Sequence, residues 1–212
     1  MGKYDISFKD LISGAEKELL KLIGLDVSGL RELNVEFTSV KEKRVDKIFE
    51  CSIGLQKAIV QIEIQLYYEK KFPVRMSGYW SDLKLTFPDL PIIQIVLTCG
   101  KKVKDSIEEE MKIKSNVGEF SFGYMKFKYT VFDLCEIPFQ RFLESDNPNI
   151  NSFGILSSDC NVQLLIQKIL DYKLEKEQTA SLITKIYILS KLKRSEGKKS
   201  YGGKTKNRSD GI

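Results

Sequence analysis

The chain has 212 residues, 42% of them apolar, which is enough to bury one sizeable core, and its formal net charge is +5. It contains no histidine, which excludes Ser–His–Asp and Cys–His hydrolases, His-ligated zinc sites and nucleases that use a histidine base. The four cysteines, Cys51, Cys99, Cys135 and Cys160, form no CxxC pair, and no apolar run reaches the roughly 18 to 20 residues of a membrane span. We therefore expect a soluble, cytoplasmic protein without a zinc knuckle or a disulfide framework.

The first predicted element is a helix between Phe8 and Ile23 that ends near Gly24. Apolar residues recur there at helical spacing and form one broad face. Glu16 falls inside the apolar arc, and Glu18 is the alternative carboxylate of this helix. A partly buried carboxylate needs a cation, a hydrogen-bond donor or a proton.

Two strands joined by a short glycine-containing loop are predicted next, over residues 44–54 and 57–66. In the second strand every even position from Ala58 to Leu66 is apolar, the alternation of a β-strand with one face on the core. The polar side chains then share the opposite face of the hairpin. These positions are Asp46, Glu50, Gln61, Glu63 and Gln65.

The second half of the chain adds three further kinds of element. Pro73 suits the first turn of a helix over residues 73–85, and the almost wholly apolar run 92–100 is typical of a central strand. A polar, helix-like stretch over 105–114 precedes an alternating strand over 124–134, and residues 161–193 contain two amphipathic helices. This order predicts an α/β sandwich with a central mixed β-sheet flanked by helices, occupying residues 1–190 as one domain.

Residues 191–212 are predicted to form a basic, disordered tail. They contain eight Lys or Arg and two acids, a balance of +6, so the first 190 residues carry about −1. Such a tail attracts phosphate, for example through Lys198 and Lys199, and the alternative is a tail that only aids solubility.

Asp46 and Glu63 are the candidate metal ligands. They lie 17 residues apart on the two strands of the hairpin, so their carboxylates can converge, and Gln65 points the same way as Glu63. Close carboxylates repel one another unless a cation lies between them. A hard cation with oxygen ligands, Mg²⁺ or Mn²⁺, fits best. The alternative is a set of polar residues on an exposed sheet face.

Four segments in order carry a resemblance to a known family. They are Arg44-Val45-Asp46-Lys47, Ile62-Glu63-Ile64-Gln65, Phe72-Pro73-Val74-Arg75-Met76 with Tyr79, and the apolar strand after Pro91. Over roughly residues 4 to 135 the chain resembles the recombination-promoting nuclease and transposase group of the PD-(D/E)XK superfamily. The resemblance implies a restriction-endonuclease-like fold and metal-dependent cleavage of DNA, linked to recombination or mobile elements.

The resemblance also implies roles for individual residues. Asp46 matches the first acid of the motif, Glu63 the second, and Gln65 the position that usually holds lysine. Asp46, Glu63 and the Ile64 carbonyl are then the ligands of one Mg²⁺, Gln65 orients a water molecule, and Glu16 is an outer carboxylate or second-metal ligand. Gln65 carries no charge, which distinguishes it from lysine.

Several alternatives stay open at the level of sequence. Arg75 and Tyr79, one helical turn apart, either contact a DNA phosphate or serve packing alone. The late helices either cover the sheet or form a homodimer surface. The function is either a Mg²⁺-dependent DNA endonuclease or a nucleic-acid-binding or protein-interaction module that has lost catalysis.

Overall fold

The computed structural model of the protein describes residues 3–34, 46–67, 69–100, 103–115 and 118–200. The chain forms two compact units where the sequence predicts one domain. Unit 1 comprises the described parts of Met1–Ser13 and Cys135–Ile212, and unit 2 comprises those of Gly14–Leu134. Each unit is described by itself below.

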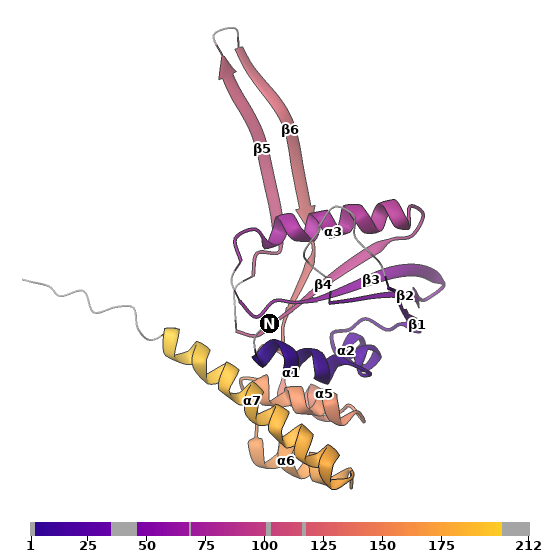
Figure 1. Ribbon diagram of the computed structural model, residues 1–212, viewed down its shortest axis with the longest axis vertical. Helices are drawn as coiled ribbons and strands as arrows, with labels where there is room; N and C mark the ends of the chain where they lie inside the picture. Colours follow the sequence, from indigo (N-terminus) through magenta and orange to yellow (C-terminus); the bar gives the residue numbers. More distant parts are fainter. Residues whose placement is uncertain (1–2, 35–45, 68, 101–102, 116–117, 201–212) are drawn as a thin grey trace, which may run out of the picture. The chain divides into compact units, whose positions relative to one another are not determined.

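Unit 2 contains a five-stranded mixed sheet with the strand order β1-β2-β3-β4-β7 (Figure 1). The first three strands form an antiparallel meander, and β4 and β7 join it in parallel. The predicted α/β fold with a mixed sheet flanked by helices is therefore confirmed. The strands are β1 (Ser28–Glu32), β2 (Lys47–Ile53), β3 (Gln56–Ile64), β4 (Ile92–Thr98) and β7 (Thr130–Asp133).

The predicted hairpin is formed by β2 and β3. Ile53 pairs with Gln56, so Gly54 and Leu55 make a two-residue turn, and Gly54 has a φ of 59°. A glycine with positive φ at the first turn position is the pattern of a type II′ turn, whose twist matches that of the flanking strands. The turn fixes the register along the whole hairpin, up to the pairing of Lys47 with Ile62.

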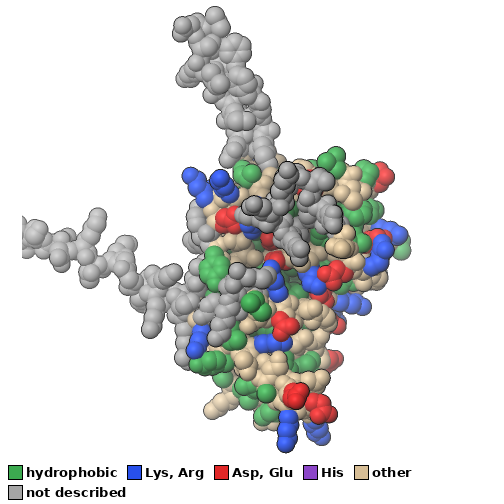
Figure 2. All heavy atoms as spheres, viewed as in Figure 1, with side chains coloured by type: hydrophobic (Ala, Val, Ile, Leu, Met, Phe, Trp, Pro, Cys, Tyr) green, Lys and Arg blue, Asp and Glu red, His purple; other side chains and the backbone are tan. Residues whose placement is uncertain are grey.

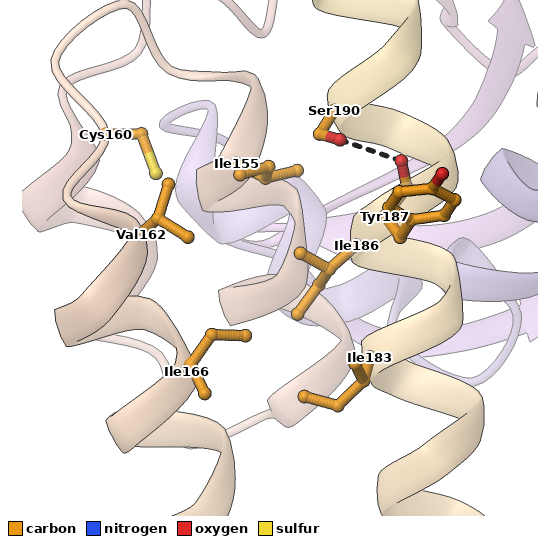
Figure 3. Close-up of a pocket in the computed structure, with 8 residues that line it drawn as sticks. All are labelled: Ile155, Cys160, Val162, Ile166, Ile183, Ile186, Tyr187 and Ser190. Atoms are coloured by element: carbon orange, nitrogen blue, oxygen red, sulfur yellow. Dashed lines mark hydrogen bonds between the residues drawn. The ribbon is translucent and has the colours of Figure 1, made fainter.

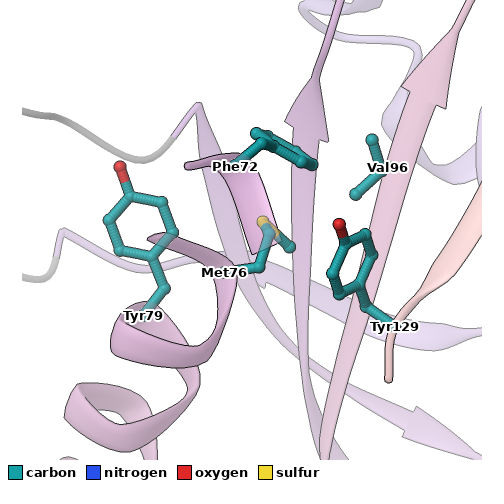
Figure 4. Close-up of a cluster of buried hydrophobic side chains, with 5 residues drawn as sticks. All are labelled: Phe72, Met76, Tyr79, Val96 and Tyr129. Atoms are coloured by element: carbon teal, nitrogen blue, oxygen red, sulfur yellow. The ribbon is translucent and has the colours of Figure 1, made fainter. Parts of the chain in front are cut away.

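Helix α3 (Phe72–Thr86) connects β3 to the parallel strand β4 and packs on one face of the sheet. Pro73 lies in its first turn, as the sequence predicts. Figure 4 shows a buried cluster in which the helix residues Phe72, Met76 and Tyr79 meet Val96 of β4 and Tyr129. The face of β3 that carries the odd-numbered residues faces this helix, because Ile59 packs against Leu83.

Both faces of β3 are buried. The even positions Ala58, Val60 and Ile62 are at most 1% exposed, and the odd positions Gln61 and Glu63 are 0% and 5% exposed. The alternative of polar residues on an exposed sheet face is therefore wrong. Gln61 is accommodated because Gln94 donates to its side-chain oxygen at 2.7 Å and also to the Met76 carbonyl of α3 at 2.9 Å.

Strands β5 (Ser106–Ser115) and β6 (Gly118–Lys128) form a separate two-stranded sheet, which connects β4 to β7 and projects beyond α3 (Figure 1). The prediction of a helix over 105–114 is wrong, because that segment is β5. The predicted strand 124–134 is divided at Tyr129 between two sheets, with β6 before it and β7 after it.

Unit 1 is helical. Phe8 and Phe153 pack with their ring centroids 4.9 Å apart, and Lys185 pairs with Asp10 at 2.6 Å. None of the helices within the described residues combines the length and apolar content of a membrane-spanning segment. The elements are α1 (Lys3–Ile12), α4 (Phe139–Leu143), α5 (Pro148–Phe153), the 3₁₀ turn η1 (Gly154–Leu156), α6 (Val162–Asp171) and α7 (Lys176–Ser200).

The predicted helix from Phe8 to Ile23 is two helices. Helix α1 ends at Ile12, and α2 (Glu16–Leu22) begins in unit 2. Gly14 between them has a φ of 78°, a left-handed conformation that ends a helix. The apolar period continues across this break because both helices bury one face.

Candidate functional site

Asp46 and Glu63 meet at the end of the β2–β3 hairpin. The Ile64 N–H donates to Asp46 Oδ2 at 2.9 Å, and the Asp46 N–H donates to Glu63 Oε2 at 3.3 Å. Each acid thus accepts a hydrogen bond from the backbone of the opposite strand. The sequence prediction that these two carboxylates converge is supported by this geometry, and both belong to unit 2.

Arg75 of α3 supplies the positive charge beside these acids. Its Nη2 lies 3.5 Å from Glu63 Oε1, and its Nη1 lies 2.6 Å from Glu69 Oε2. The guanidinium also covers the Phe72 ring, with 4.8 Å between Cζ and the ring centroid. The Arg75 side chain is 13% exposed, so in this structure it is a partly buried counter-ion of Glu63 and Glu69.

Gln65 also contacts Arg75. Its side-chain oxygen accepts a hydrogen bond from Arg75 Nη2 at 3.2 Å, and its side-chain nitrogen donates to the Tyr67 carbonyl. A lysine at this position could not accept from Arg75, whereas the amide accepts and donates at once. The guanidinium therefore places a positive charge next to the uncharged Gln65.

Tyr79 is buried in the core under α3 and is 0% exposed. Figure 4 shows it one turn beyond Met76 on the helix. Burial raises the pKa of its phenol, and the charges of Glu63 and Asp46 raise the pKa further, against the opposing charge of Arg75. The prediction that Tyr79 contacts DNA is corrected here, because a wholly buried side chain does not reach a phosphate backbone.

Glu16 lies at the start of α2 and pairs with Lys47, with 3.5 Å between Oε1 and Nζ. Lys47 alternates with Ile48, which packs against Leu83 of α3, so Lys47 faces the other side of the sheet. Burial alone would lower the pKa of Lys47, but a hydrogen bond to Glu32 and the charges of Glu32 and Glu16 raise it overall. Glu16 is thus engaged with a lysine and not with Asp46 or Glu63.

The donor set at the hairpin end consists of oxygens. Asp46, Glu63 and the Gln65 amide would offer them to a divalent cation, and Mg²⁺ is commonly held by one or two carboxylates completed by water and phosphate. Within the described ranges, no cluster of three or more Asp, Glu, Cys or His side chains is suited to a metal. The two carboxylates and the amide are oxygen donors of the kind that Mg²⁺ prefers, but alone they do not form an all-protein cage.

The sequence points to Arg75 as a contact for DNA but misses its partner Glu69 and its role beside Glu63. Spacing alone gives little signal for this network, because Glu69 lies in the loop before α3 and Glu63 on β3. The cue available is chemical. Glu63 and Gln65 share one face of the strand, and the helix that follows has an arginine near its start. Where this helix covers that face, the Glu63 carboxylate requires a counter-charge.

Lys198 and Lys199 belong to the last turn of α7, and their side chains lie outside what the structure describes. The helix therefore extends ten residues into the segment predicted as a tail, and residues 201–212 lie outside the described ranges. On the face that Figure 2 shows, Lys and Arg side chains are interspersed with Asp and Glu side chains. The described part of this face does not present a wide basic surface.

Unit 1 contains a groove between α6, α7 and η1. Figure 3 shows its lining, which includes Ile155, Ile166 and Ile186, and its volume is about 560 Å³. The Ser190 hydroxyl at its edge donates to the Tyr187 carbonyl at 2.8 Å. The lining contains no Asp, Glu, Lys or Arg side chain, and its polar groups are those of Cys160, Tyr187 and Ser190.

Comparisons of the chain with protein-family models, with curated proteins and with solved structures found no match.

Proposed function

We propose that the protein is a metal-dependent DNA endonuclease of the PD-(D/E)XK type, with a restriction-endonuclease-like sheet and Asp46 and Glu63 as its metal ligands. The observation that carries the proposal is the reciprocal bonding of these acids across the end of the β2–β3 hairpin. Carboxylates held in this way keep a fixed separation, which a metal site requires. Its link to recombination or mobile elements rests on the sequence resemblance.

Each residue has a defined part in the proposed site. Asp46 and Glu63, with the Ile64 carbonyl, would hold Mg²⁺ or Mn²⁺, and the bound ion would polarise a phosphate and acidify a water molecule. Gln65, held by Arg75, would orient that water through its amide. Arg75 balances the charge of Glu63 in the free protein and lies where it could stabilise charge on a phosphate.

The test is a plasmid-cleavage assay with Mg²⁺ or Mn²⁺. We expect nicking that EDTA stops and that Glu63→Gln and Asp46→Asn each reduce by about 100-fold, the upper end of the range for loss of a residue that supports a metal ligand. Both substitutions keep a side-chain oxygen that can accept the hydrogen bond from the backbone N–H. The fold should therefore survive, which circular dichroism would check.

Glu50→Gln is the matched control for this assay. Glu50 is a carboxylate on β2 of the same hairpin, but it pairs with Arg31 and Lys57 and not with the proposed site. We expect full activity in this variant. Cleavage that persists in Glu63→Gln, or that falls equally in Glu50→Gln, would rule out the proposed site.

A module that binds nucleic acid without cleaving it is the second candidate. The observation that favours it is Arg75, which already contacts two of the proposed oxygen donors, on Glu63 and Gln65. This candidate predicts salt-dependent DNA binding with no metal-dependent cleavage, weakened by removal of residues 201–212. The chain should be truncated after Ser200. Removing the whole segment 191–212 would also remove Leu192, which is buried in α7.

A further inference from the structure

The β5–β6 hairpin has an edge that lacks a strand partner within the described residues. β5 pairs with β6 alone, in a sheet of two strands. Two-stranded hairpins are marginally stable, and an edge strand with unpaired N–H and C=O groups is a template for another chain. Figure 1 shows the hairpin extending past α3 with no other strand of unit 2 beside it.

The two edges of this hairpin differ. The register shifts between Met111 and Lys112, where Met111 pairs with Gly123 and Lys112 with Ser121. The extra residue, Phe122, therefore lies on β6 and makes a β-bulge there. Bulges are one of the devices that blunt an edge against further pairing. β5 is the regular strand, so its edge is the one open to a partner.

The sequence of β5 is complementary to itself in charge. Its first half contains Glu108, Glu109 and Glu110, and its second half contains Lys112 and Lys114. If two copies of β5 pair antiparallel with Met111 opposite Met111, then Glu110 lies opposite Lys112 and Glu108 opposite Lys114. Directly opposed residues lie on the same side of a sheet, so these acids and bases form cross-strand pairs.

We propose that β5 pairs with β5 of a second copy of this chain, so that two hairpins form a four-stranded sheet in the order β6-β5-β5-β6 about a two-fold axis at Met111. The arrangement closes on itself, as an isologous interface does. It also raises the strand number above the two that are marginal alone. Glu108 at the start of the interface is well exposed, with 57% of its side-chain surface accessible.

Glu110 and Lys112 are the residues to test, because their neighbours on β6 are uncharged. Glu110 pairs with Tyr124 and Lys112 with Ser121, whereas Glu108 is bonded to Lys126. Glu110→Lys and Lys112→Glu should each turn two attractive intermolecular pairs into two repulsive ones. We expect a dimer dissociation constant that rises roughly 10- to 100-fold in each variant, measured by sedimentation equilibrium.

A mixture of Glu110→Lys and Lys112→Glu proteins provides the decisive test. In the mixed dimer both charge pairs are restored, so the mixture should dimerise as the unmodified protein does, even if one hairpin is weakened. Glu136→Lys, an exposed change of the same kind in unit 1, should leave the dimer unchanged. A monomeric unmodified protein, or a dimer that ignores both variants, overturns the proposal.

Cross-linking tests the register. Met111→Cys should give a disulfide-linked dimer on mild oxidation, because the two residues face each other across the axis. Ile107→Cys is the control, since the proposed register places Ile107 opposite Ser115 and the two Ile107 positions at opposite ends of the interface. Efficient cross-linking of Ile107→Cys and none of Met111→Cys would overturn this register.

Discussion

Arg75 shows how a buried carboxylate is tolerated in this protein. Glu63 is 5% exposed and lies 3.5 Å from the guanidinium, which itself is nearly buried. Removing one partner of such a pair leaves an uncompensated charge in the core. We expect Arg75→Met, which keeps most of the apolar volume, to lower the free energy of unfolding by about 3–5 kcal/mol in urea denaturation.

An exposed arginine provides the control for Arg75→Met. Arg31 makes an ion pair with Glu50 at 2.6 Å, the same distance as between Arg75 and Glu69, but its side chain is 69% exposed. Arg31→Met should therefore change stability far less, because solvent screens surface pairs. Equal losses in the two variants would show that burial of Arg75 contributes nothing to its effect.

Tyr79 makes stability sensitive to alkaline pH. Burial raises the pKa of its phenol above the ordinary value, and the nearby Glu63 raises it further. The native state therefore keeps the proton at a pH where the unfolded state loses it, so stability is full below about pH 10 and falls as pH rises beyond that value.

Tyr79→Phe is expected to reduce this alkaline loss. Urea denaturation of both proteins between about pH 8 and about pH 11 would measure the difference in slope. Some loss should remain in the variant, because burial also raises the pKa of Tyr129. Identical slopes in the two proteins would contradict the assignment to Tyr79.

The β2–β3 turn determines whether Asp46 and Glu63 meet. Gly54 has a φ of 59°, and a side chain there is strained, so Gly54→Ala should cost about 1–2 kcal/mol in thermal or urea unfolding. Gly78 in α3 is the matched control, because an added Cβ there meets nothing within 4 Å. Gly78→Ala should stabilise the protein by roughly 0.5–1 kcal/mol. A change in stability of the same sign in Gly54→Ala and Gly78→Ala would contradict this account.

At the level of elements, periodicity predicts the elements that have one distinct buried face. The β2–β3 hairpin, the helix that begins near Pro73 and the central strand β4 are confirmed. Residues 105–114 mislead because, within the described residues, β5 pairs with β6 alone and is not part of the five-stranded sheet. Its charged residues therefore resemble those of a helix surface. Strand β1 is missed because it has only five residues and most of them are exposed.

The candidate site is predictable only in part for a related reason. Asp46 and Glu63 lie on one hairpin, whose register a short turn determines, so local spacing brings them together. Glu16 depends on where the chain breaks between α1 and α2, and Tyr79 on how α3 rotates over the sheet. Such packing decisions depend on the whole core. The pattern therefore predicts a partly buried Glu16 that needs a cation, but not that the cation is Lys47, and it leaves Tyr79 open between packing and DNA contact.

At the scale of the whole molecule, the four cysteines divide between the two units. Cys51 and Cys99 are buried in unit 2, while Cys135 and Cys160 are partly buried in unit 1. Thiol reagents attack the thiolate, and burial also raises the pKa of Cys51. In the native protein we expect Cys135 and Cys160 to be labelled first, as peptide mass spectrometry would show.

Denaturant extends this labelling prediction. Exposure of Cys51 and Cys99 should follow the unfolding of unit 2, so labelling across a urea series would show whether the two units unfold together. Rapid labelling of Cys51 or Cys99 without denaturant would contradict the burial of these side chains.

The hydrogen bond from the Ile64 N–H to Asp46 Oδ2 has a spectroscopic consequence. This amide proton is held by a carboxylate instead of a neighbouring strand, so its nuclear magnetic resonance frequency should respond to whatever changes the charge on that oxygen. Titration with Mg²⁺ or with an oligonucleotide would then be visible in one backbone signal. A single isotope-labelled sample could thus distinguish binding of an ion from binding of DNA, without any turnover.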